Sequence, residues 1–323
     1  MKQFIYISLI RISDILFSPF ALLAALYFRS IRNHGITMFL CRMPITKSIF
    51  MKVGVFPLSK HYYDPLFDHS HTIFDTERKL NGIDYNIQWQ INLLREFSFW
   101  EELKMLPREK TDKTEFYFFN GTYPPWDSEF LYSIIRFKKP KRIIEIGSGN
   151  STLMARRAIE KNKEDDIKYH CEHICIEPYE ASWLESTWTQ VLRTTLETID
   201  ISLFKELEKD DILFIDSSHI IRPGWDLLRE YLEILPLLNP WVLIHIHDIF
   251  TPFEYPRQWL QDWISFWNEQ YIVEAFLSHN KDFKIICMMN YLYKIKRQEL
   301  EKCFPILEEK PQNPWSLWLE KIN

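Results

Sequence analysis

The chain has 323 residues, of which 46% are apolar and 26% charged, a composition ordinary for a globular protein with one large core or two modest ones. The formal net charge of −5 provides no overall positive field, so we expect no nucleic acid partner. The five cysteines are scattered and odd in number, which favours a reducing compartment over a disulfide framework. We therefore expect a cytoplasmic protein.

An apolar segment lies near the N-terminus, at residues 15–28 (ILFSPFALLAALYF). It is shorter than the roughly 20 residues that a membrane-spanning helix needs, and no small-residue cleavage site closes it. We expect a core or docking helix that breaks at Pro19. The alternative is an interfacial anchor that gives the protein a peripheral membrane contact, because positive side chains follow the segment: Arg29, Arg32, Lys47, Lys52 and Lys60.

The first hundred or so residues show no alternation of strands with helices. One helix is predicted over residues 85–105, where Ile87, Ile91 and Leu94 recur near a 3.6-residue period. We expect residues 1–111 to form a helical and irregular N-terminal extension that packs near the mouth of a site.

From about residue 112 the pattern changes to strands that alternate with helices. The predicted strands are residues 142–146, 173–176, 193–198, 212–215 and 241–246, and the predicted helices between them are 127–137, 151–161, 181–191 and 227–237. Such alternation indicates an α/β domain with a mostly parallel sheet and helices on both faces. We expect this domain to occupy residues 112–323.

The C-terminal part departs from this rhythm. The predicted elements are a helix at 267–277, a strand at 283–288, a helix at 291–309 and a final edge strand at 316–320. Trp259, Trp263 and Trp267 recur every four residues, which predicts one face of a helix. That face packs in the core or, if it is exposed, suits stacking against sugar rings.

The strongest chemical signal is Glu145-Ile-Gly147-Ser-Gly149-Asn-Ser151, between a predicted strand and a predicted helix. Its two glycines let the backbone turn tightly and approach a ligand, and the following helix points free N–H groups into the same space. Glu177 ends the next strand, where a carboxylate can accept both hydroxyls of a ribose. Ligands bind outside the carboxyl ends of parallel strands, and all these groups fall there.

The motif E-I-G-S-G-N-S-T resembles motif I of the class I S-adenosylmethionine-dependent methyltransferases, and I-E-P at 176–178 resembles the acidic end of their second strand. F-I-D-S-S-H at 214–219 and I-H-I-H-D-I-F at 244–250 resemble their fourth and fifth strand ends. The resemblance covers about residue 122 to the C-terminus and implies a Rossmann-like fold with S-adenosylmethionine as cofactor. The cofactor-binding residues that it implies are Glu145, Gly147, Ser148, Gly149, Ser151, Glu177 and Asp216.

Two alternatives belong to other functional classes. A nicotinamide-dependent (NAD) oxidoreductase needs a third Gly, or an Ala, where this chain has Thr152. Glu145 also suits the positive amino group of a sulfonium cofactor better than it suits a pyrophosphate. The second alternative is a non-catalytic Rossmann-like binding module.

A second group of polar residues stands at the ends of the fourth and fifth predicted strands. An alcohol that accepts a methyl group must lose its proton, and a histidine is a suitable base. We expect His219, His247 and Asp248 to be catalytic, and His245 to be a core histidine. Alternatively, Asp216, His247 and Asp248 hold Mg²⁺ or another divalent cation, as some sugar and small-molecule O-methyltransferases similar to this sequence do. His247 stands where a second carboxylate or an amide is expected, which disfavours a hard cation.

Together these expectations predict O-methylation of a hydroxyl on a sugar, a polysaccharide or another polar metabolite, so the substrate is a small molecule or a glycan. The polar strand ends and the abundant aromatic residues, 16% of the chain, are the basis for this substrate class.

Overall fold

The computed structural model describes residues 2–31, 44–58, 65–66, 72–263, 265–304, 306 and 312–323. The chain divides into two compact units, Met1–Thr72 and Ile73–Asn323. We describe each unit by itself. Of the positive residues expected to follow the N-terminal segment, Arg32 and Lys60 lie outside the described residues.

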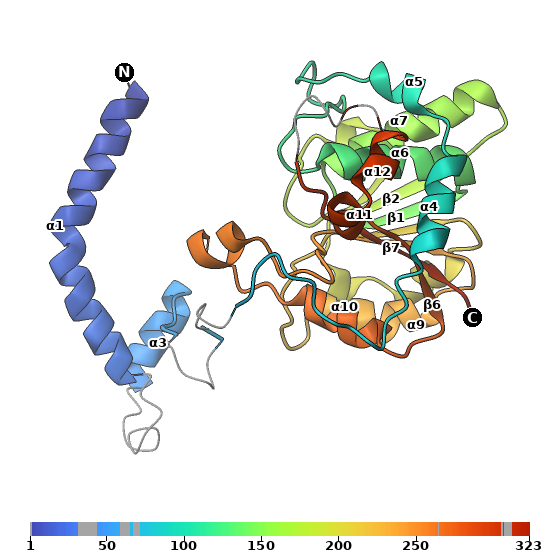
Figure 1. Cartoon of the computed structure of the whole chain (residues 1–323). Helices are drawn as coiled ribbons and strands as arrows, with labels where there is room; N and C mark the ends of the chain where they lie inside the picture. Colours follow the sequence, from blue (N-terminus) through green and yellow to red (C-terminus); the bar gives the residue numbers. More distant parts are fainter. Residues whose placement is uncertain are drawn as a thin grey trace. The chain divides into compact units, whose positions relative to one another are not determined.

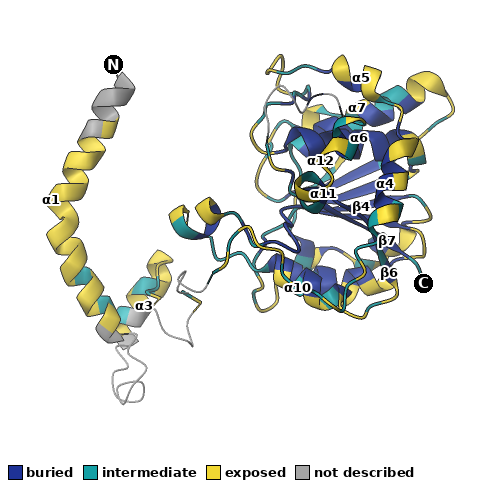
Figure 2. Cartoon of the chain, viewed as in Figure 1, coloured by how far each residue is buried: buried dark blue, intermediate teal, exposed yellow. Residues whose placement is uncertain are grey.

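The first unit contains a long helix, α1 (Lys2–Ile31), and a shorter one, α3 (Pro44–Val53). The predicted break at Pro19 is wrong, because α1 continues through it. A proline lacks the N–H that would bond to the carbonyl oxygen four residues earlier, which here belongs to Ile15. The Ser18 hydroxyl donates to that same oxygen at 2.9 Å and so satisfies it. Nor is α1 a core helix, because its apolar side chains are exposed (Figure 2).

The second unit is built on a sheet with the strand order β3-β2-β1-β4-β5-β7-β6. The strands are β1 (Arg142–Ile146), β2 (Glu172–Ile176), β3 (Gln190–Leu192), β4 (Ile212–Ile215), β5 (Leu243–Ile246), β6 (Phe283–Met288) and β7 (Leu317–Lys321). The pairs among β3, β2, β1, β4 and β5 are parallel, and β7 runs antiparallel to both β5 and β6. The four central parallel strands are almost wholly buried, as expected for a sheet covered on both faces.

Helices cover both faces of this sheet, and Figure 1 shows α6, α7 and α12 on one side with α9 and α10 on the other. The first layer consists of α4 (Ile87–Glu96), α5 (Trp100–Lys104), α6 (Pro125–Lys138), α7 (Asn150–Asp165), α11 (Met289–Ile295) and α12 (Arg297–Glu301). The second consists of α8 (Asp226–Arg229), a π-helical turn η5 (Glu230–Ile234), α9 (Leu235–Leu237) and α10 (Glu269–Leu277). The fold is the predicted Rossmann-like α/β sandwich with a helical N-terminal segment.

The expected division of the chain into an extension, residues 1–111, and a catalytic domain, residues 112–323, stays a prediction. In the structure, residues 73–111 belong to the unit that contains the sheet. For example, Gln90 on α4 accepts a hydrogen bond at 2.8 Å from the backbone N–H of Met288, which ends β6.

The strand near the C-terminus is not at the edge, as was predicted, but lies between β5 and β6. In β7, Trp318 pairs with His245 of β5 on one side and with Cys287 of β6 on the other. Such a position depends on pairing between segments far apart in the chain, which local sequence does not encode. All five residues of β7 are buried, which fits an interior strand.

Two predicted helices are shorter or broken. The helix expected over residues 85–105 is interrupted between α4 and α5, where Phe97 is extended and packs its ring 5.5 Å from that of Phe130. The helix expected over residues 291–309 begins at Met289, breaks at Lys296 and ends at Glu301 in the described part of the chain.

The helix predicted at residues 181–191 is wrong. That segment contains only a short 3₁₀ turn, η2 (Leu184–Ser186), and then enters β3. The weak strand predicted at 193–198 is also wrong, because β3 ends at Leu192 and a second 3₁₀ turn, η3 (Leu196–Thr198), follows. A third 3₁₀ turn, η4 (Ile201–Glu206), leads to β4.

The three tryptophans do not share a helix face, because the π-helical turn η6 (Gln258–Asp262) ends before the second of them. Trp259 is buried, whereas the side chain of Trp263 is 59% exposed. Trp267 lies just before α10, with its ring 5.0 Å from that of Trp259. They form an aromatic cluster rather than a stripe.

Candidate active site

A glycine bend joins β1 to α7, and its first glycine is required by close packing. Gly147 has φ +78°, and a Cβ there would lie 1.9 Å from the backbone oxygen of Asp216. The Gly147 N–H donates to Ile176 at 3.0 Å, and the Asp216 N–H donates to Ile146 at 2.9 Å. These bonds continue the ladder beyond the strands, so the ends of β1, β2 and β4 are held in register where the chain turns.

The second glycine faces open space. No atom lies within 4 Å of the position that a Cβ would take on Gly149. Its N–H donates to the hydroxyl of Thr152 at 3.1 Å, and that hydroxyl donates to the Glu145 carboxylate at 2.6 Å. The start of α7 is thus tied to the end of β1.

Glu145 is fully buried beneath this bend. One of its oxygens lies 2.8 Å from Nε2 of His173, which is also buried. Burial lowers the pKa of His173, but Cys175 and the Glu145 carboxylate raise it more, to about 10, so the pair is an internal ion pair at neutral pH. Because Glu145 does not line the neighbouring pocket, its direct contact with a cofactor stays a prediction.

Glu177 directly follows β2 and joins two loops. One carboxylate oxygen accepts the Ser148 N–H at 3.2 Å, and the other accepts the N–H groups of Tyr179 and Glu180 at 2.9 and 2.8 Å. A carboxylate has about four acceptor positions, so about one is left for a ligand. Its role toward a ribose stays a prediction.

A pocket of about 390 Å³ opens beside the glycine bend. Four of the residues expected to contact a cofactor line it, namely Ser148, Gly149, Ser151 and Asp216. Three residues for which no role was expected line it too, namely Lys110, Lys113 and Trp183. Tyr123, which lies just before α6, is a further wall residue, and its hydroxyl donates to the Asp127 carbonyl at 3.2 Å.

Asp216, His219 and Asp248 meet at the carboxyl ends of β4 and β5. Nε2 of His219 lies 3.3 Å from a carboxylate oxygen of each aspartate. Their ligand atoms all lie within 4.8 Å of one another, a set that can hold a metal ion. We call these three residues the strand-end cluster. The Asp216 side chain is 37% exposed and reaches the pocket, whereas the other two are buried.

A residue that sequence reasoning missed completes this environment. Nδ1 of His219 lies 2.7 Å from a carboxylate oxygen of Glu269, the first residue of α10, whose other oxygen accepts the Tyr231 hydroxyl at 2.7 Å. The Trp267 ring lies 4.4 Å from the imidazole ring. No local signal marks Glu269, which is fifty positions away from His219 in the chain.

The charges of the strand-end cluster are strongly coupled. Burial alone would lower the pKa of His219, but the carboxylates around its ring outweigh burial and hold this pKa well above its ordinary value. Burial raises the pKa of Asp248 to about 6, although both nearby imidazoles oppose the rise. The same carboxylates therefore favour the protonated form of the His219 ring.

His247 and His245 lie deeper in the sheet. The ring of His245 stacks on Phe214 at 3.9 Å, and burial lowers its pKa well below the ordinary value, as expected for a core histidine. Neither ring nitrogen of His247 has a hydrogen-bond partner among the described residues, and its Nε2 lies 3.8 Å from Asp248. The structure thus places His219, and not His247, between the two aspartates. The catalytic and metal-binding roles predicted for His247 stay predictions.

Asp127 lies in the first turn of α6, whose N-cap residue is Pro124. The carboxylate instead accepts the N–H of Trp315 at 2.6 Å and that of Ser316 at 3.2 Å, and so holds the segment before β7.

Comparison with known proteins shows what this part of the chain is similar to. Residues 144–249 match the model of a methyltransferase domain. An uncharacterized protein of Archaeoglobus fulgidus is 29% identical over 182 residues, which cover 51% of this chain and 80% of that protein. The match to the methyltransferase model confirms the resemblance inferred from the sequence.

Similar solved structures include two described as O-methyltransferases. TomG of Streptomyces achromogenes, in complex with S-adenosylmethionine, is 16% identical to this chain, with a TM-score of 0.36. The match covers 61% of this chain and 79% of TomG. An O-methyltransferase of Bacillus cereus, in complex with S-adenosylhomocysteine, is 13% identical to this chain, with a TM-score of 0.31. The match covers 75% of this chain and 98% of that enzyme.

Proposed function

On the premise that this chain is an S-adenosylmethionine-dependent methyltransferase with a Rossmann-like fold, we propose that it methylates a hydroxyl of a sugar, a polysaccharide or another polar metabolite. The observation that carries the proposal is the strand-end cluster, in which one imidazole lies 3.3 Å from two carboxylates beside the pocket. An alcohol needs a group that removes its proton during methyl transfer, and the cluster contains such groups.

The residues around the pocket fit the cofactor. Gly149 leaves open space where any other residue would place a Cβ, and the loop from Ser148 to Ser151 leads its backbone N–H groups into α7. We assign Ser148, Gly149, Ser151 and Asp216 to cofactor binding, with Glu177 accepting from the ribose. When bound, the cofactor supplies an electrophilic methyl group on a sulfonium.

Glu145 acts on the cofactor site indirectly. Its carboxylate orients the Thr152 hydroxyl, which in turn accepts the N–H of Gly149. We propose that Glu145 is a positioning residue for the glycine bend and that His173 neutralises its buried charge.

The proton of the acceptor hydroxyl goes to the strand-end cluster. Asp248 accepts it, and His219 keeps the cluster from accumulating negative charge by remaining protonated between the carboxylates. Glu269 holds the ring of His219 in place from behind, at 2.7 Å from Nδ1. This proposal differs from the expectation from the sequence, in which a histidine was the base that removes the proton.

The same three residues support a second arrangement. Two carboxylates and one imidazole within 4.8 Å of one another suit a divalent cation, which would acidify the acceptor hydroxyl as a Lewis acid. His219 would then replace His247 in the ligand set expected from the sequence.

Calorimetric titration of the full chain with S-adenosylhomocysteine, with and without Mg²⁺, tests the cofactor and the metal together. We expect one site per chain. If chelators change neither the affinity for S-adenosylhomocysteine nor turnover, the proton-transfer arrangement is supported. If chelators abolish turnover while the cofactor still binds, the arrangement with a divalent cation is supported. Stabilisation by NAD with no response to S-adenosylhomocysteine would overturn the proposal in favour of an oxidoreductase.

Turnover is measured with hydroxylated sugars and with catechol-like and amine acceptors as comparisons. Methyl transfer to an amine and not to a hydroxyl would contradict the O-methylation. The double variant Asp248→Asn with His219→Gln separates an enzyme from a binding module, because a non-catalytic module would keep its partner binding.

A further inference from the structure

The apolar surface of α1 has little cover within the chain. Every described side chain from Leu9 to Leu23 is exposed. Contacts with α3 involve the C-terminal end of α1, where the Tyr27 hydroxyl lies 3.1 Å from that of Thr46 and the ring of Phe28 lies 5.1 Å from that of Phe50. An uncovered apolar surface of this extent is unfavourable in water and marks an interaction site.

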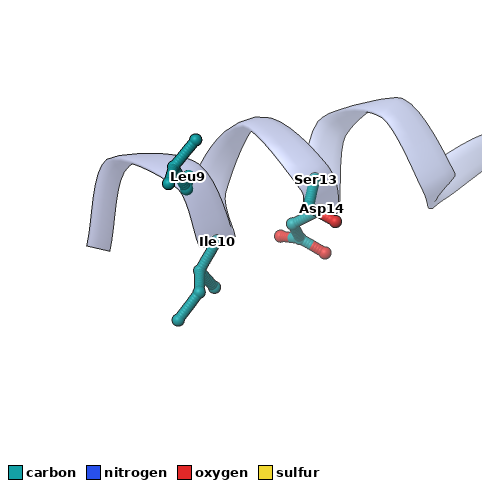
Figure 3. Close-up of a pocket in the computed structure, with 4 residues that line it drawn as sticks. All are labelled: Leu9, Ile10, Ser13 and Asp14. Carbon is teal, nitrogen blue, oxygen red and sulfur yellow. The ribbon is translucent and has the colours of Figure 1, made fainter. Parts of the chain in front are cut away.

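The hollow on this helix is not a ligand pocket. Figure 3 shows its lining, Leu9, Ile10, Ser13 and Asp14, and all four residues come from α1 itself. No other element lines it in the part of the chain that the structure describes, so the hollow is part of the helix surface.

We propose that residues 9–29 of α1 span a lipid bilayer. The most apolar 18-residue window of this stretch has a mean hydropathy of 1.8, and none of that window is buried within the protein. At 1.5 Å per residue the stretch of 21 residues is about 31 Å long, which matches the roughly 30 Å of a bilayer's hydrocarbon core. The segment first expected at residues 15–28, and too short to span, becomes long enough because α1 begins before it and the apolar stretch starts at Leu9.

The polar groups of this stretch are compatible with a span. Arg11 and Asp14 lie within its first two turns, close to one interface, and their three-residue spacing puts them on one side of the helix. In hydrocarbon every backbone acceptor must be satisfied internally. The Ser18 hydroxyl does this for the Ile15 oxygen that Pro19 leaves without a donor.

Lysine and arginine residues are unequally distributed on the two sides of the span. Lys2 and Arg11 lie at its N-terminal end, whereas Arg29, Arg32, Arg42 and Lys47 end or follow it within about 20 residues. Positive residues stay on the cytoplasmic side, so we place the N-terminus outside and the methyltransferase unit in the cytoplasm.

A fractionation experiment on the full chain, expressed in a bacterial host, tests the span. We expect the protein in the membrane pellet after washing with alkaline carbonate, with an intact mass that includes α1. Release by carbonate would mean a peripheral contact, recovery in the soluble fraction would mean another partner, and a mass that lacks α1 would mean a cleaved signal. Each of these three results overturns the proposal.

Matched charge insertions separate a spanning helix from one that lies flat on the membrane. Leu16→Arg with Leu23→Arg places charge on one side of α1, and Ala21→Arg with Ala25→Arg places it on the opposite side, which carries small and polar residues. A spanning helix loses both variants from the washed membranes, each by about tenfold or more. A flat helix would tolerate the second pair, which would contradict the proposal.

Two controls guard against loss of folding. Leu16→Ile with Leu23→Ile should stay in the membrane like the wild type. The released arginine variants should keep the far-ultraviolet circular dichroism of the second unit, so that their release reports on α1.

The orientation is tested with an epitope tag at the N-terminus. Protease added to intact spheroplasts should remove the tag and leave the methyltransferase unit protected. Protection of the tag with digestion of that unit would reverse the assigned orientation and refute this part of the proposal.

Discussion

Two groups in which a carboxylate contacts an imidazole lie near the carboxyl ends of the central parallel strands. They differ in the number of carboxylates around the imidazole and in their exposure to water. Beneath the glycine bend, Glu145 and His173 are both fully buried and pair at 2.8 Å. Beyond β4 and β5, His219 faces two aspartates at 3.3 Å, one of which is partly exposed to the pocket. The first pair is sealed from solvent and substrate, whereas the second can exchange a proton or accept a cation.

This difference implies that the buried pair has a structural role and that the strand-end cluster has a chemical one. A buried pair with balanced charge holds its neighbours in place and loses stability when one partner is removed. A cluster with more acids than bases, open on one side, has groups whose protonation can change during a reaction. We therefore expect substitutions at the first site to change stability and substitutions at the second to change turnover.

The largest effect is expected at the bend between the two groups. Gly147→Ala would place a Cβ 1.9 Å from the Asp216 backbone oxygen at a positive φ, so we expect a destabilisation of about 4 kcal/mol or more, measured by thermal and urea unfolding. Gly149→Ala is the matched control. Because its Cβ meets no atom within 4 Å, unfolding should be little changed while S-adenosylhomocysteine binding weakens. Equal unfolding of the two variants would show that the bend is not under this constraint.

Removal of one member of the sealed pair comes next. Glu145→Ala leaves the buried, protonated His173 without its partner at 2.8 Å, and breaking such a pair costs about 3–5 kcal/mol. The double variant Glu145→Gln with His173→Gln should recover part of this loss. If Glu145→Ala weakened cofactor binding without changing unfolding, Glu145 would be a direct ligand, as first expected from the sequence, and not a support.

At the strand-end cluster we expect the opposite outcome. His219→Gln removes the positive charge between the aspartates, so turnover should fall by about a hundredfold, which corresponds to about 2.7 kcal/mol, since general acid–base groups contribute 10²–10⁴-fold. Affinity for S-adenosylhomocysteine should stay within about threefold. Glu269→Gln should lower turnover less, and loss of cofactor affinity in step with turnover would make this cluster structural.

The smallest predicted effect is a change of stability with pH. His173 has a folded-state pKa of about 10, above its ordinary 6.5, so its contribution is complete below pH 6.5 and is lost as the pH rises through 10. Between pH 7 and 9 we expect a loss of about 1–3 kcal/mol, measured by urea unfolding. The double glutamine variant at positions 145 and 173 should lack this alkaline loss, and an unchanged slope in that variant would assign it to another group.

The comparison also shows what the sequence could predict. The glycine bend and the residues after β4 and β5 were found because a strand, a turn and a helix are encoded locally. Glu269 and the interior position of β7 depend on contacts between distant segments, which no local pattern specifies. The continuity of α1 was missed because Pro19 was taken as a break, whereas the Ser18 hydroxyl donates to the acceptor that Pro19 leaves.

The positions of the site residues could be predicted from local sequence, but their roles depend on contacts in the fold. Glu145 was found by its spacing from Gly147, but its burial under the bend and its ion pair with His173 follow from the packing of β1 against β2. His219 and His247 were equivalent in the sequence. The structure distinguishes them, because only the first has carboxylates at both ring nitrogens.

The most direct test of the central claim is the hydroxyl-methylating turnover of Asp248→Asn and His219→Gln, measured beside their calorimetric affinity for S-adenosylhomocysteine. The account predicts nearly wild-type cofactor binding with turnover reduced by about a hundredfold or more in both variants. Undiminished turnover in both would mean that the strand-end cluster does not take the proton, and the proposed chemistry would be contradicted.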